Sequence, residues 1–209
     1  MTPSSMIDLD ELCIFPATSA EEREKVFDVR YEGYGKYYDS RADVIDKYDS
    51  APNVTLLLAT DGKGGPLGTM RLLDRSQGEI ELDEFLDAEN LFSEAVADSC
   101  IELTRFAVPH HAWRKKLKIS LIKASYLYGK HNGSEALVAW VREDKAHLCR
   151  QFLYKSVGPD GSFHHPGIGG EQHNTYKLDL TNVEQRYKEQ EHSFYEFLCI
   201  TEHKNIQVS

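Results

Sequence analysis

Apolar residues recur along the chain with two different periods, one typical of strands and one typical of helices. The short runs typical of buried strands lie at residues 53–60, 67–73, 100–108, 136–141 and 174–180. The amphipathic runs typical of helices lie at residues 20–34, 113–133, 145–155 and 181–200. Residues 80–97 are acidic and fit one or two short helices. This order of strands and helices predicts an α/β fold built in layers.

Capping and turn residues mark the ends of several elements. Ser19 and Glu22 have the spacing of a capping box, so a helix is predicted to start near Ala20. The glycine-rich turn at residues 61–65 joins two strand-like runs into a predicted β-hairpin. Residues 158–170 contain G-P-D-G and H-P-G-I-G-G and are predicted to form a long loop. This loop does not follow a strand and open a helix, so no nucleotide site is expected there.

Composition narrows the class of protein. The chain has 209 residues, of which 41% are hydrophobic, and a formal net charge of -10. This size predicts a single domain over residues 1–209, with its core at about residues 20–180 and a C-terminal helix over 181–200. The acidic balance argues against nucleic acid as a partner. Because no segment has the pattern of a secretion signal or of a membrane span, a cytoplasmic protein without an integral membrane segment is expected.

Cysteine and histidine spacing gives no sign of a metal centre. The chain has four widely spaced cysteines without a C-x-x-C pattern, which are Cys13, Cys100, Cys149 and Cys199. Neither a zinc site nor a disulfide framework is predicted from them. Cys100 is expected to be a packed thiol rather than a nucleophile. His110 and His111 are paired but lack a further ligand at a closing spacing, so no metal site is expected.

Two charged residues interrupt the strand-like run C-I-E-L-T-R-F-A-V at residues 100–108. Unpaired charges inside a sheet are costly. Residues three apart in a regular strand point to opposite faces, so Glu102 and Arg105 meet in one cleft only if a bulge breaks the strand. An edge strand whose charges face water is the alternative interpretation.

Two further arginines lie in predicted secondary structure. Arg71 lies among apolar residues of the run 67–73 and needs a partner, for which the chain offers Glu102, Asp46 or Asp49. Arg30 lies beside a helical stripe that includes Tyr34. The pattern leaves open whether Arg30 projects toward the surface that the stripe covers or into solvent.

The segment from Glu32 to Ser50 has no sustained period and is rich in tyrosine and aspartate. It is predicted to be an irregular loop. Tyrosine offers apolar area with a polar end, so the loop suits a lid or a substrate-facing wall, and a loop fixed to the core by its tyrosines fits as well. Asp46 and Asp49 fit two roles, holding an amine substrate or anchoring the arginines.

The densest basic cluster of this acidic chain opens the helix predicted over residues 113–133. It consists of Arg114, Lys115, Lys116 and Lys118. The backbone N–H groups at a helix N-terminus favour an anion. A phosphate or an acidic partner protein is therefore one interpretation of the cluster, and a solvated charged face is the other.

An ordered set of motifs is similar to that of a known family. The motifs are R-Y-x-x-Y (residues 30–34), D-K-Y-D (46–49), L-G-T-M-R-L (67–72) and E-L-T-R-F-A-V (102–108). Together they resemble the acyl-homoserine-lactone synthases and, more closely, the related N-acyl amino acid synthases of the GNAT superfamily. The resemblance covers roughly residues 20 to 180.

The resemblance implies a GNAT-like fold, in which a mixed twisted sheet flanked by helices opens into a V-shaped cleft. An acyl-phosphopantetheine thioester lies in that cleft as co-substrate, and no bound cofactor is expected. The donor in this family is typically acyl carrier protein. The glycine-containing signature that binds coenzyme A would fall at residues 114–118, where this chain reads R-K-K-L-K. This departure makes acyl-CoA the less favoured donor and suits the acidic surface of a carrier protein.

The resemblance also suggests how acyl transfer to an amine takes place. An α-amino group has a pKa of about 8 and must lose a proton before it attacks. Glu102 is the candidate general base, directly or through water, with its charge held by Arg71 or Arg105. Backbone N–H groups of Phe106, Ala107 and Val108 are candidates for the oxyanion site.

The acceptor is predicted from the arginines and from a departure in the N-terminal segment. Arg30, Arg71 or Arg105 is a candidate to bind an acceptor carboxylate. Homoserine-lactone synthases typically place Phe and Trp over S-adenosylmethionine; here Tyr34 fills the first place and Ser40 lies near the second. The departure favours an amino acid or another small amine as acceptor.

Three functions remain open at this point. The first is an N-acyltransferase that joins a fatty acyl group from acyl carrier protein to an amino acid or similar small amine. The second is an acyl-homoserine-lactone synthase that uses S-adenosylmethionine. The third is a GNAT-like module that binds acyl carrier protein or lipid without turnover. Separately, a purely structural ion network is the alternative to a site role for Arg71, Glu102 and Arg105.

Overall fold

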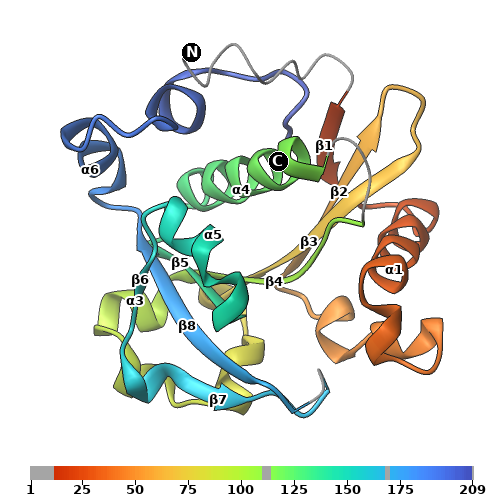
Figure 1. Cartoon of the computed structure of the whole chain (residues 1–209), viewed down its shortest axis with the longest axis horizontal. Coiled ribbons are helices and arrows are strands. Elements are labelled where there is room, and N and C mark those ends of the chain that lie inside the picture. Colours follow the sequence, from red (N-terminus) through yellow and green to blue (C-terminus); the bar gives the residue numbers. More distant parts are fainter. Residues whose placement is uncertain (1–11, 110–113, 168–169, 209) are drawn as a thin grey trace.

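A mixed sheet of eight strands runs through the computed structural model, which describes residues 12–109, 114–167 and 170–208 (Figure 1). The strands are β1 (Leu12–Pro16), β2 (Val54–Asp61), β3 (Pro66–Asp74), β4 (Cys100–Ala107), β5 (Ala136–Arg142), β6 (Lys155–Ser156), β7 (Ser162–His164) and β8 (Gln172–Asp179). The α-helices are α1 (Ala20–Tyr34), α2 (Ala88–Leu91), α3 (Glu94–Asp98), α4 (Arg114–His131), α5 (Ala146–Gln151) and α6 (Val183–Glu189).

The sheet opens between β4 and β5. The strand order is β1-β2-β3-β4-β5-β8-β6, with β7 paired to β8, and the pair of β4 and β5 is parallel while its neighbours are antiparallel. Pairing of β4 with β5 begins at Cys100 and Ala136 and ends at Leu103 and Ala139, although both strands continue. The two strands therefore diverge beyond this point, which is the V-shaped opening that the resemblance implies.

A β-bulge lies in β4 where the strands diverge. Thr69 of β3 pairs with Ala107 of β4, but Arg71 pairs with Thr104, so β4 has one residue more than β3 in this stretch. Arg105 lies within the stretch and has a φ of 49°. This backbone conformation is uncommon for a residue with a side chain and fits a bulge that redirects it. The bulge that Glu102 and Arg105 need if they are to meet in one cleft is thus present.

Helices cover both faces of the sheet. Phe27 of α1 belongs to a buried cluster with Leu56 and Leu58 of β2. Leu121 of α4 belongs to another cluster, with Leu57 of β2. Successive residues of a strand point to opposite faces, so α1 and α4 lie on opposite sides of the sheet. The sheet is therefore the middle of three layers.

Helix α1 begins where the sequence predicts it and lies close to the bulge. Ser19 caps the helix, and the reciprocal bonds between Ser19 and Glu22 form the expected capping box. Gly33 in the last turn faces β4. A Cβ atom at Gly33 would lie 3.1 Å from the Cβ of Ala107, so glycine allows the helix to approach the strand this closely.

Three segments differ from the sequence predictions. The helix expected over residues 145–155 ends at Gln151, and β6 begins at Lys155. The loop expected at 158–170 contains β7, a short strand on β8. The helix expected over 181–200 is divided into α6 and a π-helical turn, Glu196–Ile200, because Glu191 adopts a positive φ of 47° and ends the first helix. Strand β1 was not predicted.

The C-terminal segment closes one edge of the sheet. The Ile14 N–H donates to the Asn205 carbonyl, and the Gln207 N–H donates to the Ile14 carbonyl, both at 2.8 Å. Ile14 and Ile206 form a parallel bridge. The outer edge of β1 is thereby covered, which protects it from pairing with another chain. Within the described residues, no helix has both the length and the apolar character needed to cross a lipid bilayer.

Replacement of Ile206 by alanine tests the contribution of this segment. The Ile206 side chain is 7% exposed, whereas that of Ile200, in the preceding turn, is 53% exposed. Ile206→Ala is expected to lower the free energy of unfolding by about 2 kcal/mol, because it removes buried apolar surface and leaves a cavity. Ile200→Ala is expected to change it by less than about 0.5 kcal/mol. Urea unfolding measures both, and equal effects would contradict the docked segment.

Candidate active site

Arg71 of β3 is fully buried and lies among carboxylates. Its Nη1 donates to Asp46 Oδ1 at 2.5 Å and to Asp49 Oδ1 at 3.3 Å, and its Nη2 donates to a carboxylate oxygen of Glu81. Its Nε donates to Thr104 Oγ1 on β4 at 2.9 Å. A guanidinium is tolerated inside a protein only where it is paired and hydrogen-bonded, and Arg71 meets both conditions. It is the centre of a buried ion network.

Arg105 joins this network from the bulge in β4. Its Nε and Nη2 donate to Asp46 Oδ2 at 3.1 and 2.6 Å, and Nη2 also donates to Glu81 Oε1 at 3.1 Å. Its Nη1 donates to the Tyr38 hydroxyl at 2.9 Å. Arg71 and Arg105 therefore share the same two carboxylates. The bulge brings Arg105 to the side of the sheet that Arg71 occupies.

Arg30 reaches the same network from α1. Its side chain is fully buried, so the solvated alternative does not hold. Its Nη1 donates to Asp49 Oδ1 at 2.7 Å, while its Nε and Nη2 have no hydrogen-bond partner among the residues that the structure describes. Burial lowers the pKa of Arg30, and the Asp49 carboxylate opposes that effect. Asp49 thus links Arg30 to Arg71, and both aspartates of the D-K-Y-D motif anchor arginines.

Glu102 is also fully buried, but its partners differ from those predicted. Its Oε2 accepts from the Glu81 N–H at 2.7 Å, and its Oε1 accepts from the Leu82 N–H at 2.9 Å and the Trp140 Nε1–H at 2.8 Å. Among the described residues, Glu102 has no ion pair with Arg71 or Arg105. Asp46, Asp49 and Glu81 already occupy both guanidinium groups, so the predicted arginine partner acts on Glu102 only from a distance, and Arg71 opposes the rise in the pKa of Glu102.

The carboxyl groups of the network differ in proton affinity. Burial and the nearby Glu81 carboxylate raise the pKa of Glu102 to about 8, against the opposing effect of its N–H donors. Burial alone would raise the pKa of Asp46, but Arg71 and Arg105 lower it to about 2. The same arginines and the His165 imidazole lower the pKa of Glu81 in spite of its burial. A carboxyl group with a pKa near 8 suits proton transfer at neutral pH.

Three residues of the network were not singled out from the sequence. Glu81 bridges Arg71 and Arg105 through its side chain and contacts Glu102 through its N–H. His165 Nδ1 accepts from the Gly167 N–H at 3.1 Å, so Nε2 carries the proton and faces Glu81 Oε1 at 3.5 Å. The His165 ring stacks on that of Trp140, with centroids 5.1 Å apart. Glu81 and His165 are 84 residues apart, and no sequence pattern links them.

The tyrosine-rich segment lies along the opening of the sheet. The Tyr34 hydroxyl donates to the Phe106 carbonyl in the bulge at 2.6 Å, and burial raises the pKa of Tyr34 to about 12. Tyr38 accepts from Arg105 on β4, and Tyr37 accepts from Arg142 on β5 at 3.1 Å. The segment is thus fixed to the core by its hydroxyl groups, and it contacts both strands that diverge.

The other predicted residues lie at the end of β4 and the start of α4. Phe106 is half-buried, and Ala107 and Val108 are buried beside the bulge. Helix α4 begins at Arg114; Lys115 is exposed, and Lys116 and Lys118 are partly buried.

Cys100 is a packed thiol, and the described cysteines and histidines take part in no metal-binding group of three or more side chains. Cys100 is fully buried, and burial raises the pKa of its thiol to about 12, as expected for a packed thiol. Among the residues that the structure describes, no group of three or more His, Cys, Asp or Glu side chains is arranged to hold a metal ion. His110 and His111 lie outside the described residues.

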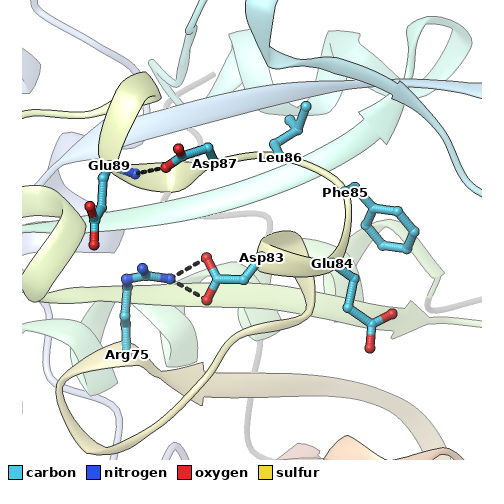
Figure 2. A pocket seen from close by; sticks show the side chains of 7 residues that line it. All are labelled: Arg75, Asp83, Glu84, Phe85, Leu86, Asp87 and Glu89. Atoms are coloured by element: carbon cyan, nitrogen blue, oxygen red, sulfur yellow. Dashed lines mark hydrogen bonds and ion pairs between the residues drawn. The ribbon is translucent and has the colours of Figure 1, made fainter.

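An open surface hollow of about 490 Å³ lies on the acidic segment between β3 and α2 (Figure 2). Its lining residues are Arg75, Asp83, Glu84, Phe85, Leu86, Asp87 and Glu89. Figure 2 shows the Arg75 guanidinium and the Asp83 carboxylate pointing toward each other, and the two form an ion pair. The hollow includes none of the network residues, so it is not the candidate active site.

Comparison with known proteins decides the family. The model of a family described as N-acyl amino acid synthase FeeM matches residues 25–178, well over half of the chain. The chain belongs to the FeeM family. This membership confirms the resemblance stated from the sequence and makes the protein an N-acyltransferase. No sequence among the curated proteins matches the chain significantly.

Solved structures similar to this FeeM-family chain share its fold at low sequence identity. FeeM itself, an N-acyl amino acid synthase from uncultured soil microbes, has a TM-score of 0.65 and 13% identity, over 83% of this chain and 93% of that one. The acyl-homoserine-lactone synthase LasI has a TM-score of 0.56 and 18% identity, over 81% and 88%. The CoA-dependent acyl-homoserine-lactone synthase BjaI, solved with SAM and isopentyl-CoA, has a TM-score of 0.54 and 15% identity, over 85% and 90%. The predicted GNAT-like fold is confirmed.

Removal of Arg71 tests the buried network. Arg71→Leu is expected to lower the free energy of unfolding by about 3–5 kcal/mol, because Asp46, Asp49 and Glu81 lose a buried partner. Arg75→Leu is the matched control. Arg75 directly follows β3, and Arg75→Leu breaks only its partly exposed ion pair with Asp83. This change is expected to lower the free energy of unfolding by about 1 kcal/mol or less. Denaturant unfolding of both variants gives the comparison, and similar losses would show that the network is not the stabilising centre.

Proposed function

We propose that the protein transfers a fatty acyl group from the thioester of acyl carrier protein to the amine of an amino acid or a similar small amine. The observation that carries this proposal is Glu102. It is a buried carboxyl group with a pKa near 8, two residues before the diverging part of β4, in a member of the FeeM family. A group of that proton affinity is suited to take a proton from an ammonium group near neutral pH.

Proton balance defines what the site must do. An ammonium group carries three protons, and the nitrogen of the amide product carries one. One proton goes with the thiolate leaving group, which becomes a thiol, and the other must go to a base and then to water. Because Glu102 is fully buried, it acts through a water relay in this proposal. Asp46 has a pKa near 2 and binds protons too weakly for the role.

The bulge in β4 supplies the candidate oxyanion site in this proposal. The pairing of β3 with β4 passes over Arg105 and Phe106, which frees the chain locally from a regular ladder. Backbone N–H groups of Phe106, Ala107 and Val108 stabilise the negative charge that develops on the thioester oxygen in this proposal. Tyr34 supports this arrangement because its hydroxyl fixes the Phe106 carbonyl.

The basic start of α4 supports acyl carrier protein as donor. Lys115, Lys116 and Lys118 lie on the first turns of the helix that follows β4. They replace the glycines that the resemblance associates with a coenzyme A pyrophosphate site. Several positive charges on one helix suit an acidic protein surface, and this attraction acts mainly on the rate of association.

Product analysis tests the function. The purified protein is incubated with medium- and long-chain acyl carrier proteins or the matching acyl-CoAs, and with pooled amino acids or S-adenosylmethionine. An N-acyl amino acid identified by mass spectrometry is the expected product. A homoserine lactone instead would assign the second function. Binding of the acyl donor without formation of any product would contradict the proposed catalysis and favour the third function, a binding module.

Glu102→Gln tests the base. It is expected to lower kcat by about 10²- to 10⁴-fold, with Glu94→Gln on the exposed face of α3 as the control. In the wild type, kcat/KM is expected to rise as Glu102 loses its proton and to level off above a pH of about 8. Full activity of Glu102→Gln with an unchanged pH profile would exclude Glu102 as the base.

Charge reversal on α4 tests the donor site. Lys115→Glu combined with Lys118→Glu is expected to raise KM for acyl carrier protein by about tenfold or more. KM for an acyl-pantetheine donor, which lacks the carrier protein, is expected to stay within about twofold. Steady-state kinetics with the two donors separates the cases. An equal rise for both donors would place the lysines at the thioester rather than at the carrier protein.

A further inference from the structure

An amino acid acceptor needs a cation for its carboxylate, and the three arginines predicted for this role are already occupied. Arg30 and Arg71 are fully buried, and the Arg105 side chain is 10% exposed. Each is paired with a buried or partly buried carboxylate of Asp46, Asp49 or Glu81. At Arg71 or Arg105 a substrate carboxylate would have to displace one of these carboxylates and leave it unpaired inside the protein, which is strongly unfavourable. Arg30 keeps two nitrogens without a partner among the described residues, but its side chain is closed off from solvent.

Arg142 is an accessible guanidinium at the opening of the sheet. It is the last residue of β5, three residues beyond Ala139, where the pairing with β4 ends. Its side chain is 21% exposed. Its Nη1 donates to the Tyr37 hydroxyl at 3.1 Å and forms an ion pair with Glu171 Oε2 at 2.6 Å. Arg142 therefore combines access to solvent with a place beside the diverging strands.

Two consecutive tyrosines join Arg142 to the bulge. Tyr37 accepts a hydrogen bond from Arg142 on β5, and Tyr38 accepts one from Arg105 on β4. Arg142 and Arg105 thus lie on the two sides of the opening. They are close enough for two tyrosines that are adjacent in sequence to contact both of them. A ligand held by Arg142 is within the same opening as the Phe106 carbonyl, which Tyr34 contacts.

The partners of Arg142 allow one of them to be exchanged. Asp144 binds its Nε at 3.0 Å and its Nη2 at 2.8 Å, which keeps the guanidinium in place. The carboxylate on Nη1 belongs to Glu171, whose side chain is 48% exposed. Ion pairs of exposed carboxylates are weak, and a released Glu171 returns to water. A substrate carboxylate therefore replaces Glu171 on Arg142 Nη1 at a much lower cost in free energy than it would replace a partner of Arg71.

We propose that Arg142 binds the α-carboxylate of the acceptor, which takes the place of Glu171, with the Tyr37 hydroxyl as a second donor. This inference rests on the proposed function and names the substrate class, an amine with a carboxylate on the neighbouring carbon. The Tyr37 oxygen accepts from Arg142, and no described residue accepts from its O–H, so this O–H is available to a carboxylate bound at Nη1. Amines without this carboxylate lose both interactions and are poor acceptors.

Kinetics with paired acceptors test the proposal. The wild type and Arg142→Gln are assayed with the amino acid found in the product analysis and with its primary amide. For the amino acid, Arg142→Gln is expected to raise KM at least about tenfold, the loss expected for a hydrogen bond to a charged group. For the amide, KM is expected to change by less than about twofold, because no carboxylate is present. An equal rise for both acceptors would overturn the proposal.

Two further variants separate binding from folding. Arg150→Gln is the matched control, because exposed Arg150 also contacts a carboxylate, Glu143, and a tyrosine hydroxyl, Tyr176, and it is expected to leave both KM values unchanged. Glu171→Gln removes the competing carboxylate and is expected to lower KM for the amino acid but not for the amide. An unchanged or higher KM in Glu171→Gln would contradict the exchange, even if Arg142→Gln fails to fold.

A binding measurement keeps this inference separate from the proposed function. If the wild type forms no product with any amine, the proposed function fails. Calorimetric titration with a long-chain N-acyl phenylalanine and with its primary amide then tests Arg142 alone. The acid is expected to bind the wild type at least about tenfold more tightly than the amide, and Arg142→Gln is expected to abolish the difference. Equal binding of acid and amide to the wild type would exclude a carboxylate site at Arg142.

Discussion

The structure depends on the pairing of Arg71, a cation that has no access to water. Its three carboxylate partners come from the loop before β2 and from the turn after β3. Because a buried guanidinium must be paired, these two segments cannot leave the sheet without a large loss of free energy. The ion pairs therefore determine where the tyrosine-rich segment and the acidic segment lie, and both border the opening between β4 and β5.

Charge balance within the network explains the special state of Glu102. Three arginines, Arg30, Arg71 and Arg105, face three carboxylates that each contact at least one of them. Glu102 is a fourth carboxylate, and its contacts are N–H groups rather than cations. Its ionised form is therefore less favoured than those of Asp46 and Glu81, and its pKa rises while theirs fall. A stabilising network and a proton acceptor thus arise from the same set of residues.

Local sequence patterns predicted most of the fold, whereas most contacts between distant segments could not be predicted from the sequence. The capping box at Ser19 correctly predicted the start of α1, and of the two interpretations of the charges in β4, a bulge or an edge strand, the structure shows the bulge. The requirement that Arg71 be paired correctly named Asp46 and Asp49. The same requirement did not identify Glu81, because several acidic residues were equally available and only the tertiary structure selects one. The N–H groups that contact Glu102 were not identified for the same reason.

The contact of Tyr37 with β5 and of Tyr38 with β4 also limits the width of the opening. Neighbouring Cα atoms are separated by 3.8 Å, so the backbone of the two tyrosines holds their attachment points close together while each hydroxyl reaches a different strand. A cleft linked in this way cannot widen for a bulkier chain without loss of a hydrogen bond. The width of the opening is therefore set by two hydrogen bonds that neighbouring residues make, one to each strand.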